Sequence, residues 1–153
     1  GIVLSESAAA PRDWWLIGSD ISTRVLRRAE AATFSEDELD GLSPARRTRY
    51  LLRARRLRDA GGRPIYRVAP DLRQRARFLQ ANLHAMDTVQ SFTADIVFLR
   101  NVLIYFDPAA QTRAVDAVLD RLRPGGVLLT GHAEALGPHA ALTPIQPSIY
   151  RKV

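Results

Sequence analysis

Polar residues follow several apolar runs of the chain, and these are the positions whose residue types and spacing suit chemistry. They are Asp20, Asn82, the pair Arg100-Asn101, and His132. If the apolar runs are strands of one parallel sheet, their carboxyl ends meet at one edge, where open α/β sheets bind ligands. A single such residue is more often a cap or a turn former, but four together favour a ligand site.

The cysteine and histidine content of the chain excludes other kinds of chemistry. The chain has no cysteine, which excludes disulfides, thiolate catalysis and cysteine-bound zinc. His84 and His139 have no histidine or carboxylate at metal-ligand spacing, so we expect no metal site. For His132 the favoured interpretation is a loop histidine without a titration role.

Apolar patterning predicts the elements that must position these residues. Continuous or alternating apolar runs predict strands, and the run at 94–99 predicts burial on both faces, as in a parallel sheet. Cap residues and apolar stripes predict helices, one of them Arg-rich, with Tyr50, Leu51 and Leu57 on its apolar side. The strands are expected at 14–18 (buried), 65–68, 76–81, 94–99 and 127–131, with a hairpin over 142–153; the helices are expected at 1–10 (ended by Pro11), from 22 or 23 to 32, from 35 to 41, from 43 onward and from 107 to 122. The alternation indicates an α/β fold.

Composition sets broader limits. The 153 residues, 46% of them hydrophobic, carry a net charge of +6, and twelve arginines fall within residues 43–80. This bias has two readings: a GC-rich genome, or a basic surface that faces nucleic acid, anionic lipid or an acidic protein helix. No apolar run approaches the roughly 20 residues of a membrane span and no signal peptide opens the chain, so no membrane insertion and a cytoplasmic protein are expected.

Several motifs, in the same order, resemble the chemotaxis receptor methyltransferases of the CheR family. They are GSDIST at 18–23, YRVAPDLR at 66–73, Asn82-Leu83, FLRNVLIYFD at 98–107, LRPGG at 122–126 and GHAE at 131–134. The family usually has serine where Ala133 stands and often cysteine where Leu99 stands. The RNVLIYF stretch is the most specific of these motifs, whereas Pro-Gly-Gly turns occur in many methyltransferases.

The resemblance implies a fold. It is a Rossmann-like, class I S-adenosylmethionine-dependent methyltransferase sheet with a small inserted antiparallel β subdomain. Residues 1–153 would be the C-terminal part of a CheR-type domain, with the subdomain and its linking helices at about 35–77. The family's N-terminal helical domain, first strand and glycine-rich turn have no counterpart in the sequence, so the sheet is expected to be incomplete.

The resemblance also implies an activity and a site. The family transfers a methyl group from S-adenosylmethionine, leaving S-adenosylhomocysteine, to a glutamate γ-carboxyl of a receptor. By resemblance, Asp20 would hold the ribose hydroxyls, and Asn82-Leu83 would lie against adenine. Arg100 and Asn101 would line the pocket, and Tyr105 would lie near the transferred methyl. Two plainer alternatives stay open: Tyr105 and Phe106 as aromatic core, and Arg100 in an ion pair with Asp20 or Asp107.

The partners expected are chemoreceptor cytoplasmic helices or the receptor's C-terminal tail. The absence of an Asn/Asp-Pro-Pro-aromatic motif argues against a nucleic-acid methyltransferase, and no nucleic-acid partner is expected. A degenerate, inactive relative that works as a protein-binding module is the alternative. A missing central strand would leave apolar strand edges open, and we expect one of three outcomes. The flanking strands pair directly, or two chains form an intertwined homodimer (the favoured outcome), or the chain needs a further N-terminal part. The same gap predicts weak cofactor binding by this chain alone.

Overall fold

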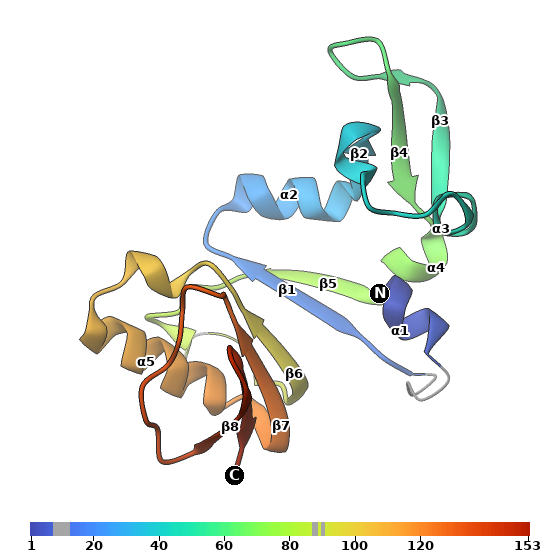
Figure 1. Cartoon of the computed structure of the whole chain (residues 1–153). Coiled ribbons are helices and arrows are strands. Elements are labelled where there is room, and N and C mark those ends of the chain that lie inside the picture. The colour runs from blue at the N-terminus through green and yellow to red at the C-terminus, as the bar shows by residue number, and fades with distance from the viewer. Residues whose placement is uncertain (8–12, 87–88, 90) are drawn as a thin grey trace. The chain divides into compact units, whose positions relative to one another are not determined.

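The computed structural model describes residues 1–7, 13–86, 89 and 91–153, and it divides into two units, residues 1–80 and 81–153 (Figure 1). Each unit contains a pair of parallel strands, and the first also contains an antiparallel sheet. The expected α/β architecture with an inserted antiparallel sheet is therefore confirmed. No helix within the described residues is long and apolar enough to cross a membrane.

The first unit is built on two parallel strands, β1 (Leu16–Asp20) and β5 (Ala76–Gln80), paired so that Asp20 lies opposite Gln80. Helix α2 (Thr23–Ala31) packs on both strands. Of the two expected caps, Ser22 and Thr23, it begins at Ser22, whose hydroxyl accepts a hydrogen bond from the Val25 amide at 3.4 Å. The short helices α1 (Ile2–Glu6) and α4 (Pro70–Arg73) complete the unit.

An antiparallel sheet is inserted between α2 and β5. Its order is β2-β4-β3, with β2 at Thr33–Ser35, β4 at Pro64–Val68 and β3 at Leu51–Arg58. The 3-10 helix η1 (Asp37–Leu39) and helix α3 (Pro44–Tyr50) connect β2 to β3. Because β4 pairs on both sides, β3 is an edge strand.

The second unit is a four-stranded sheet in the order β6-β7-β9-β8. The parallel strands β6 (Ala94–Leu99) and β7 (Leu122–Thr130) are joined through the 3-10 helix η3 (Leu103–Tyr105) and helix α5 (Pro108–Leu119). Asp107 caps α5, with its carboxylate 2.8 Å from the Ala110 amide nitrogen. The strands β8 (Leu142–Gln146) and β9 (Ile149–Lys152) form the expected C-terminal hairpin.

Helix α5 covers one face of this sheet. The core joins the apolar stripe of α5 to inward side chains of η3 and of all four strands. The buried core residues are Leu99, Leu103, Ala114, Val115, Val118, Leu119, Leu122, Leu128, Leu142 and Tyr150. On the opposite face of β6, Ile96 and Phe98 are 51% and 67% exposed. The prediction that β6 is buried on both faces is therefore wrong for the described residues, because α5 covers only the face of Val97 and Leu99.

Strand β1 corrects a similar prediction. The strand begins at Leu16 rather than Trp14, and Trp15, Leu16 and Ile17 are exposed, so it is not the buried strand that the sequence predicts. Its hydrogen-bonded partner is β5, whereas β6 pairs with β7 in a separate sheet. The expected helix at 1–10 is described over Ile2–Glu6, and Pro11 lies outside the described residues.

Two helix predictions need correction in the inserted sheet. The Arg-rich helix ends at Tyr50, and the chain continues as β3, because Leu51 pairs with Val68 and is buried. Leu57, predicted on the helix's apolar side, is exposed on that strand. The helical stretch predicted from Ser35 is a single 3-10 turn that ends before Gly41, whose φ of 87° suits glycine.

Candidate functional site

The loop that follows β6 presents two of the predicted site residues of the second unit, Arg100 and Tyr105, to solvent. Arg100 comes directly after the strand, and Asn101 adopts a left-handed conformation with a φ of 59°, which asparagine tolerates better than most residues. Leu103, only 2% exposed, anchors the loop in the core. Tyr105, in contrast, is 80% exposed, so the loop turns Arg100 and Tyr105 outward.

The carboxylate of Glu134 holds the backbone of this loop. Its Oε2 accepts hydrogen bonds from the amides of Asn101 at 2.6 Å and Gly131 at 2.7 Å. Its Oε1 accepts from Val102 and Leu103, both at 2.7 Å, and from Ile104 at 3.3 Å. Glu134 itself is 5% exposed. The amides at the start of a 3-10 turn have no partner within the turn, so the carboxylate satisfies them as a cap would.

The electrostatics of Glu134 follow from these contacts. Burial raises the pKa of this carboxyl, but the hydrogen bonds from the amides of Asn101, Gly131, Ile104 and Leu103 lower it by more, so its pKa lies below the usual value. Glu134 is therefore ionised at neutral pH. Its negative charge faces the positive, amide end of η3, which is the favourable orientation for an anion at a helix start.

A second side chain holds the carbonyl groups of the same loop. The amide nitrogen of Gln111, on α5, donates to the Leu103 carbonyl at 3.0 Å and to the Phe106 carbonyl at 3.1 Å. Glu134 thus binds the loop's N–H groups and Gln111 binds two of its C=O groups. The loop is held from both sides, while Arg100 and Tyr105 stay outside these contacts.

The segment after β5 lies beside this loop. The Asn82 side chain accepts a hydrogen bond from the His84 amide at 2.9 Å, which fixes a tight turn. The ring of His84 lies 4.6 Å from that of Phe106, centroid to centroid. Leu83 and Phe106 both pack against the core of the unit. The structure therefore brings Asn82 and Leu83 together with the loop of Arg100, Asn101 and Tyr105.

Asp20 lies in the first unit and is the last residue of β1, as the sequence predicts for a carboxylate at the end of a strand. Its Oδ1 accepts a hydrogen bond from the Ser22 amide at 2.7 Å, which fixes the side chain beside the start of α2. Within the described residues, its Oδ2 has no hydrogen-bond partner. One carboxylate oxygen is therefore positioned and the other is available to a ligand hydroxyl.

The structure decides the alternative that the sequence leaves open for Tyr105 and Phe106 and, for Arg100, the proposed ion pair with Asp107. Tyr105 is not a core residue, whereas Phe106 is half-buried and packs against the core. Arg100 forms no ion pair with Asp107, whose carboxylate caps α5 instead. Among the residues that the structure describes, Arg100 has no hydrogen-bond partner, and a solvated guanidinium of this kind is free to bind an anion.

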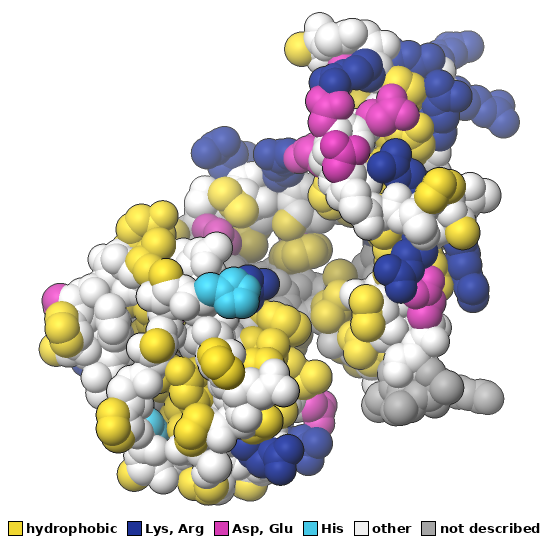
Figure 2. Space-filling model, viewed as in Figure 1, with side chains coloured by type: hydrophobic (Ala, Val, Ile, Leu, Met, Phe, Trp, Pro, Cys, Tyr) yellow, Lys and Arg dark blue, Asp and Glu magenta, His cyan; other side chains and the backbone are white. Residues whose placement is uncertain are grey.

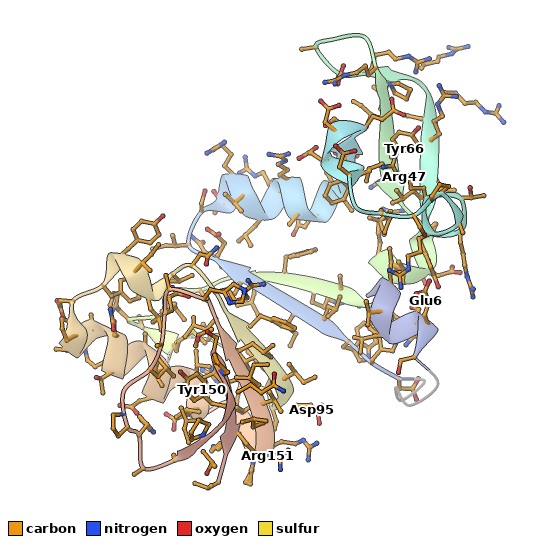
Figure 3. All side chains as sticks on the ribbon, in the orientation of Figure 1. Glu6, Arg47, Tyr66, Asp95, Tyr150 and Arg151 are labelled. Atoms are coloured by element: carbon orange, nitrogen blue, oxygen red, sulfur yellow. The ribbon has the colours of Figure 1, made fainter. Side chains whose placement is uncertain are left out.

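The described residues also include His132 and two cavities as candidate features. His132 is exposed. A cavity of about 570 Å³ lies between the 136–139 loop and the β8–β9 hairpin, and one of about 460 Å³ lies in the first unit between α2 and β5. Tyr150, which accepts a hydrogen bond from the Leu136 amide at 2.9 Å, lines the first cavity (Figure 3). None of the predicted site residues lines either cavity. Within the described ranges, no group of three His, Asp or Glu side chains could hold a metal.

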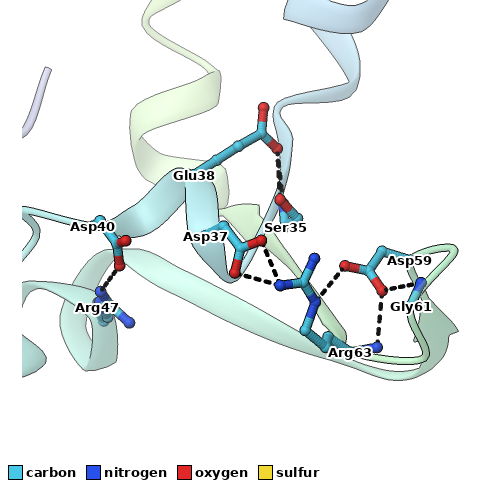
Figure 4. Close-up of polar contacts among 8 residues, drawn as sticks. All are labelled: Ser35, Asp37, Glu38, Asp40, Arg47, Asp59, Gly61 and Arg63. Carbon is cyan, nitrogen blue, oxygen red and sulfur yellow. Dashed lines mark hydrogen bonds and ion pairs between the residues drawn. The ribbon is translucent and has the colours of Figure 1, made fainter.

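The inserted sheet carries the basic surface, and Figure 2 shows Lys and Arg side chains gathered on it. Some of these arginines are neutralised: Arg63 pairs with Asp37 and Asp59, and Arg47 lies 3.7 Å from Asp40 (Figure 4). The arginines of edge strand β3 differ. Arg53, Arg55 and Arg56 are exposed and form no ion pair within the described part of the chain.

Comparison with known proteins identifies the family to which this constellation belongs. The model described as "CheR methyltransferase, SAM binding domain" matches residues 1–148. The chain belongs to the CheR methyltransferase family. The family is a class I methyltransferase fold that binds S-adenosylmethionine, so this cofactor and the fold class expected from the sequence are confirmed.

Individual members of the CheR family show the same relationship. A chemotaxis protein methyltransferase 2 of Vibrio cholerae is 38% identical over 122 residues, which cover 79% of this chain and 40% of that protein. The chemotaxis protein methyltransferases of Klebsiella aerogenes and Escherichia coli are 36% and 33% identical, covering 88% and 82% of this chain. The chain spans less than half the length of these relatives, 44% and 42% for the last two.

The residues present fit parts of S-adenosylmethionine. The available oxygen of Asp20 suits a ribose hydroxyl, since a carboxylate accepts hydrogen bonds from a cis diol. The half-buried Leu83 suits the apolar face of adenine. Both assignments follow the sequence analysis.

Sequence analysis missed the role of Glu134, although this residue ends the GHAE motif. The available signal was an acid three residues after the glycine that follows a buried strand, a spacing that lets the side chain turn back to the strand end. Gly131 makes this approach possible, because a Cβ there would lie 2.4 Å from Glu134 Oε2 and 2.7 Å from Asn101 Oδ1.

Proposed function

We propose that the protein containing this chain methylates glutamate side chains of chemotaxis receptors, with S-adenosylmethionine as the methyl donor and a γ-carboxyl methyl ester as the product. Residues 1–153 are the C-terminal part of its catalytic domain, with the inserted subdomain at about 35–77. The observation that carries the proposal is the pair of outward groups, Arg100 and Tyr105, on a loop fixed by Glu134 in a chain that belongs to the CheR family.

The proposed chemistry needs positioning more than proton transfer. The cofactor supplies an electrophilic methyl group on a sulfonium. A glutamate carboxylate, with an ordinary pKa near 4.3, is already ionised at neutral pH and needs no strong base. Arg100 binds this carboxylate through its planar guanidinium and orients one oxygen for in-line attack. Tyr105 would lie near the transferred methyl and would donate a hydrogen bond from its hydroxyl to the carboxylate.

The remaining predicted residues bind the cofactor. Asp20 accepts hydrogen bonds from the ribose hydroxyls, Asn82 and Leu83 lie against adenine, and Asn101 lines the pocket beside Arg100. Within the first unit Asp20 ends β1, and within the second unit Asn101 closely follows β6, which supports each assignment separately, since ligands of open α/β sheets bind at the carboxyl ends of strands.

The test of this assignment uses the protein as its cell produces it, with any residues that flank this chain. Asp20→Ala is expected to weaken S-adenosylhomocysteine binding in calorimetry by about 1–3 kcal/mol, the range for losing hydrogen bonds to a charged group. Arg100→Ala and Tyr105→Phe are expected to lower the rate of methyl ester formation, followed by mass spectrometry, more than they lower cofactor affinity. Asp71→Ala, an exposed acid at the start of α4, is the matched control for Asp20.

The same measurements separate the proposal from its alternative. A protein that binds a receptor peptide but neither binds S-adenosylhomocysteine nor forms a methyl ester is a protein-binding module rather than an enzyme. Normal cofactor binding by Asp20→Ala would show that the ribose assignment is wrong.

The exposed arginines of β3 support an acidic protein partner for the inserted sheet. We propose that this surface binds receptor cytoplasmic helices or the receptor tail. Charge reversal at Arg53 and Arg56 should weaken receptor binding more at low salt than at high salt, because screening shortens the range of surface charges. The same change at Arg24 and Arg27, which are exposed on α2, is the control. Equal binding by both double variants at about 50 mM salt, where the Debye length exceeds 10 Å, would show that β3 is only a solvated face.

A further inference from the structure

Five backbone amides from two separate parts of the second unit converge on one carboxylate. Four belong to residues 101–104, which follow β6, and the fifth belongs to Gly131, which follows β7. Because β6 and β7 are parallel and Leu99 lies opposite Thr130, both segments leave the sheet at the same edge. Glu134 is therefore the link between the two strand ends.

The link holds a backbone conformation that the loop does not favour by itself. Asn101 has a positive φ, and Val102 has φ −120° and ψ −42°, outside regular helix and strand values. A carboxylate that accepts several amide hydrogen bonds compensates for such a conformation, as anion-binding backbone nests do. Here the anion is part of the chain and is buried, so it holds the loop before any ligand binds.

We propose that Glu134 is a positioning residue for methyl transfer, which sets the directions of Arg100 and Tyr105 without touching the substrate. This inference rests on the function proposed above. Among the four amides of residues 101–104 that Glu134 binds, Arg100 immediately precedes the first and Tyr105 immediately follows the last. A rotation of the backbone between them would move both side chains together.

The arrangement of amide donors requires two acceptor oxygens at residue 134, so a side chain of the same shape that carries a donor does not replace the Glu134 carboxylate. Oε1 and Oε2 both accept N–H groups, so neither position tolerates a donor. In Glu134→Gln, one oxygen becomes an NH₂ group, which faces amide donors in either orientation. The control is Asp95→Asn (Asp95 is labelled in Figure 3), which removes the same charge from an exposed carboxylate of β6 that pairs with Arg123.

The test measures loop protection, kinetics and coupling on the protein as its cell produces it. In Glu134→Gln, amide hydrogen exchange of residues 101–104 should become at least about 10-fold faster. The kcat should fall about 100-fold, the order of loss from a misplacement of about 1 Å, and by more than the S-adenosylhomocysteine Kd rises. Asp95→Asn should leave all three near wild type.

A double-mutant cycle distinguishes positioning from general stability. If Glu134 acts through Arg100 and Tyr105, then Glu134→Gln should reduce kcat less than about 3-fold further in a protein that already carries Arg100→Ala and Tyr105→Phe. A general loss of folded protein would instead reduce activity by the same factor in both backgrounds. Should Glu134→Gln not fold, Glu134→Asp replaces it: the shorter side chain cannot reach both strand ends, and the same pattern is expected with a smaller loss.

Each outcome bears on a different claim. Wild-type kcat and exchange in both Glu134 variants, or fully multiplicative losses in the cycle, would overturn the positioning role while the proposed function stands. Absence of methyl transfer by the wild-type protein, or normal turnover by Arg100→Ala, would overturn the proposed function and this inference with it.

Discussion

The contact between Gly131 and Glu134 can be tested with a single methyl group. In Gly131→Ala, the added Cβ would lie 2.4 Å from Glu134 Oε2, 2.7 Å from Asn101 Oδ1 and 3.1 Å from Glu134 Cδ. Ordinary contacts of this kind are 3.4 Å or longer. The carboxylate must therefore move by about 1 Å, which takes its 2.6–2.7 Å bonds to the Asn101 and Gly131 amides beyond hydrogen-bonding distance.

The expected cost combines two effects. Forcing an extra methyl group into a packed site costs about 1–3 kcal/mol, and leaving a buried charged group with fewer hydrogen bonds costs a similar amount. Because the loop can relax in part, we expect the free energy of unfolding to fall by about 2–4 kcal/mol. Gly137→Ala, in the same connection between β7 and β8, is the control: its Cβ would meet no atom within 4 Å, and its effect should stay within about 0.5 kcal/mol.

Urea unfolding at neutral pH, followed by far-UV circular dichroism, measures both variants by linear extrapolation. Amide hydrogen exchange of residues 101–104 provides a local readout and should become faster only in Gly131→Ala. If Gly131→Ala and Gly137→Ala unfold within 0.5 kcal/mol of each other and protect these amides equally, the carboxylate does not lie where the structure places it.

Three further predictions concern pH, capping and association. Because the pKa of Glu134 is lowered on folding, its contribution to stability is present above the unfolded pKa of about 4.3 and is lost as pH falls through the folded value. In urea unfolding at a series of pH values, the difference in unfolding free energy between wild type and Glu134→Gln should therefore shrink below about pH 4, and a constant difference would contradict this. Asp107→Ala should cost about 1 kcal/mol in thermal unfolding, and Asp107→Asn only a few tenths, because asparagine also caps; equal losses would exclude a capping role. The exposed Ile96 and Phe98 on β6 should make residues 1–153 self-associate in light scattering, and Phe98→Asp should weaken this; a monomer at all concentrations would disprove it.

Local sequence signals predicted several of the helix starts and strand ends. Ser43 and Asp107 each cap the helix expected to start there, and Ser22, one of two expected caps, starts α2, because a cap depends on a side chain and an amide only three residues apart. Asp20 and Arg100 stand at the ends of their strands for a similarly local reason: an apolar run ends where a polar residue begins.

Structural features that depend on residues far away in the chain could not be predicted from the sequence. Residues 51–58 have the composition of a helix, yet Leu51 pairs with Val68 and the segment is a strand, because cross-strand pairing outweighs helix propensity. Glu134 shows the same limit at the site. Its amide donors at 101–104 lie 30 to 33 residues earlier in the chain, and no spacing rule connects them.

The way the second unit is built explains how Arg100 and Tyr105, the groups proposed to act in the reaction, can be exposed and still be held in place. Arg100 is solvated, so it carries no desolvation cost in the free protein and remains available to a carboxylate. Exposure alone would leave it mobile, and ordering a flexible loop on binding would reduce the affinity. Glu134 and Gln111 remove most of that cost in advance, since one binds the loop's amides and the other its carbonyls. The buried anion thus fixes the backbone, and in the proposed reaction the exposed cation recognises the substrate.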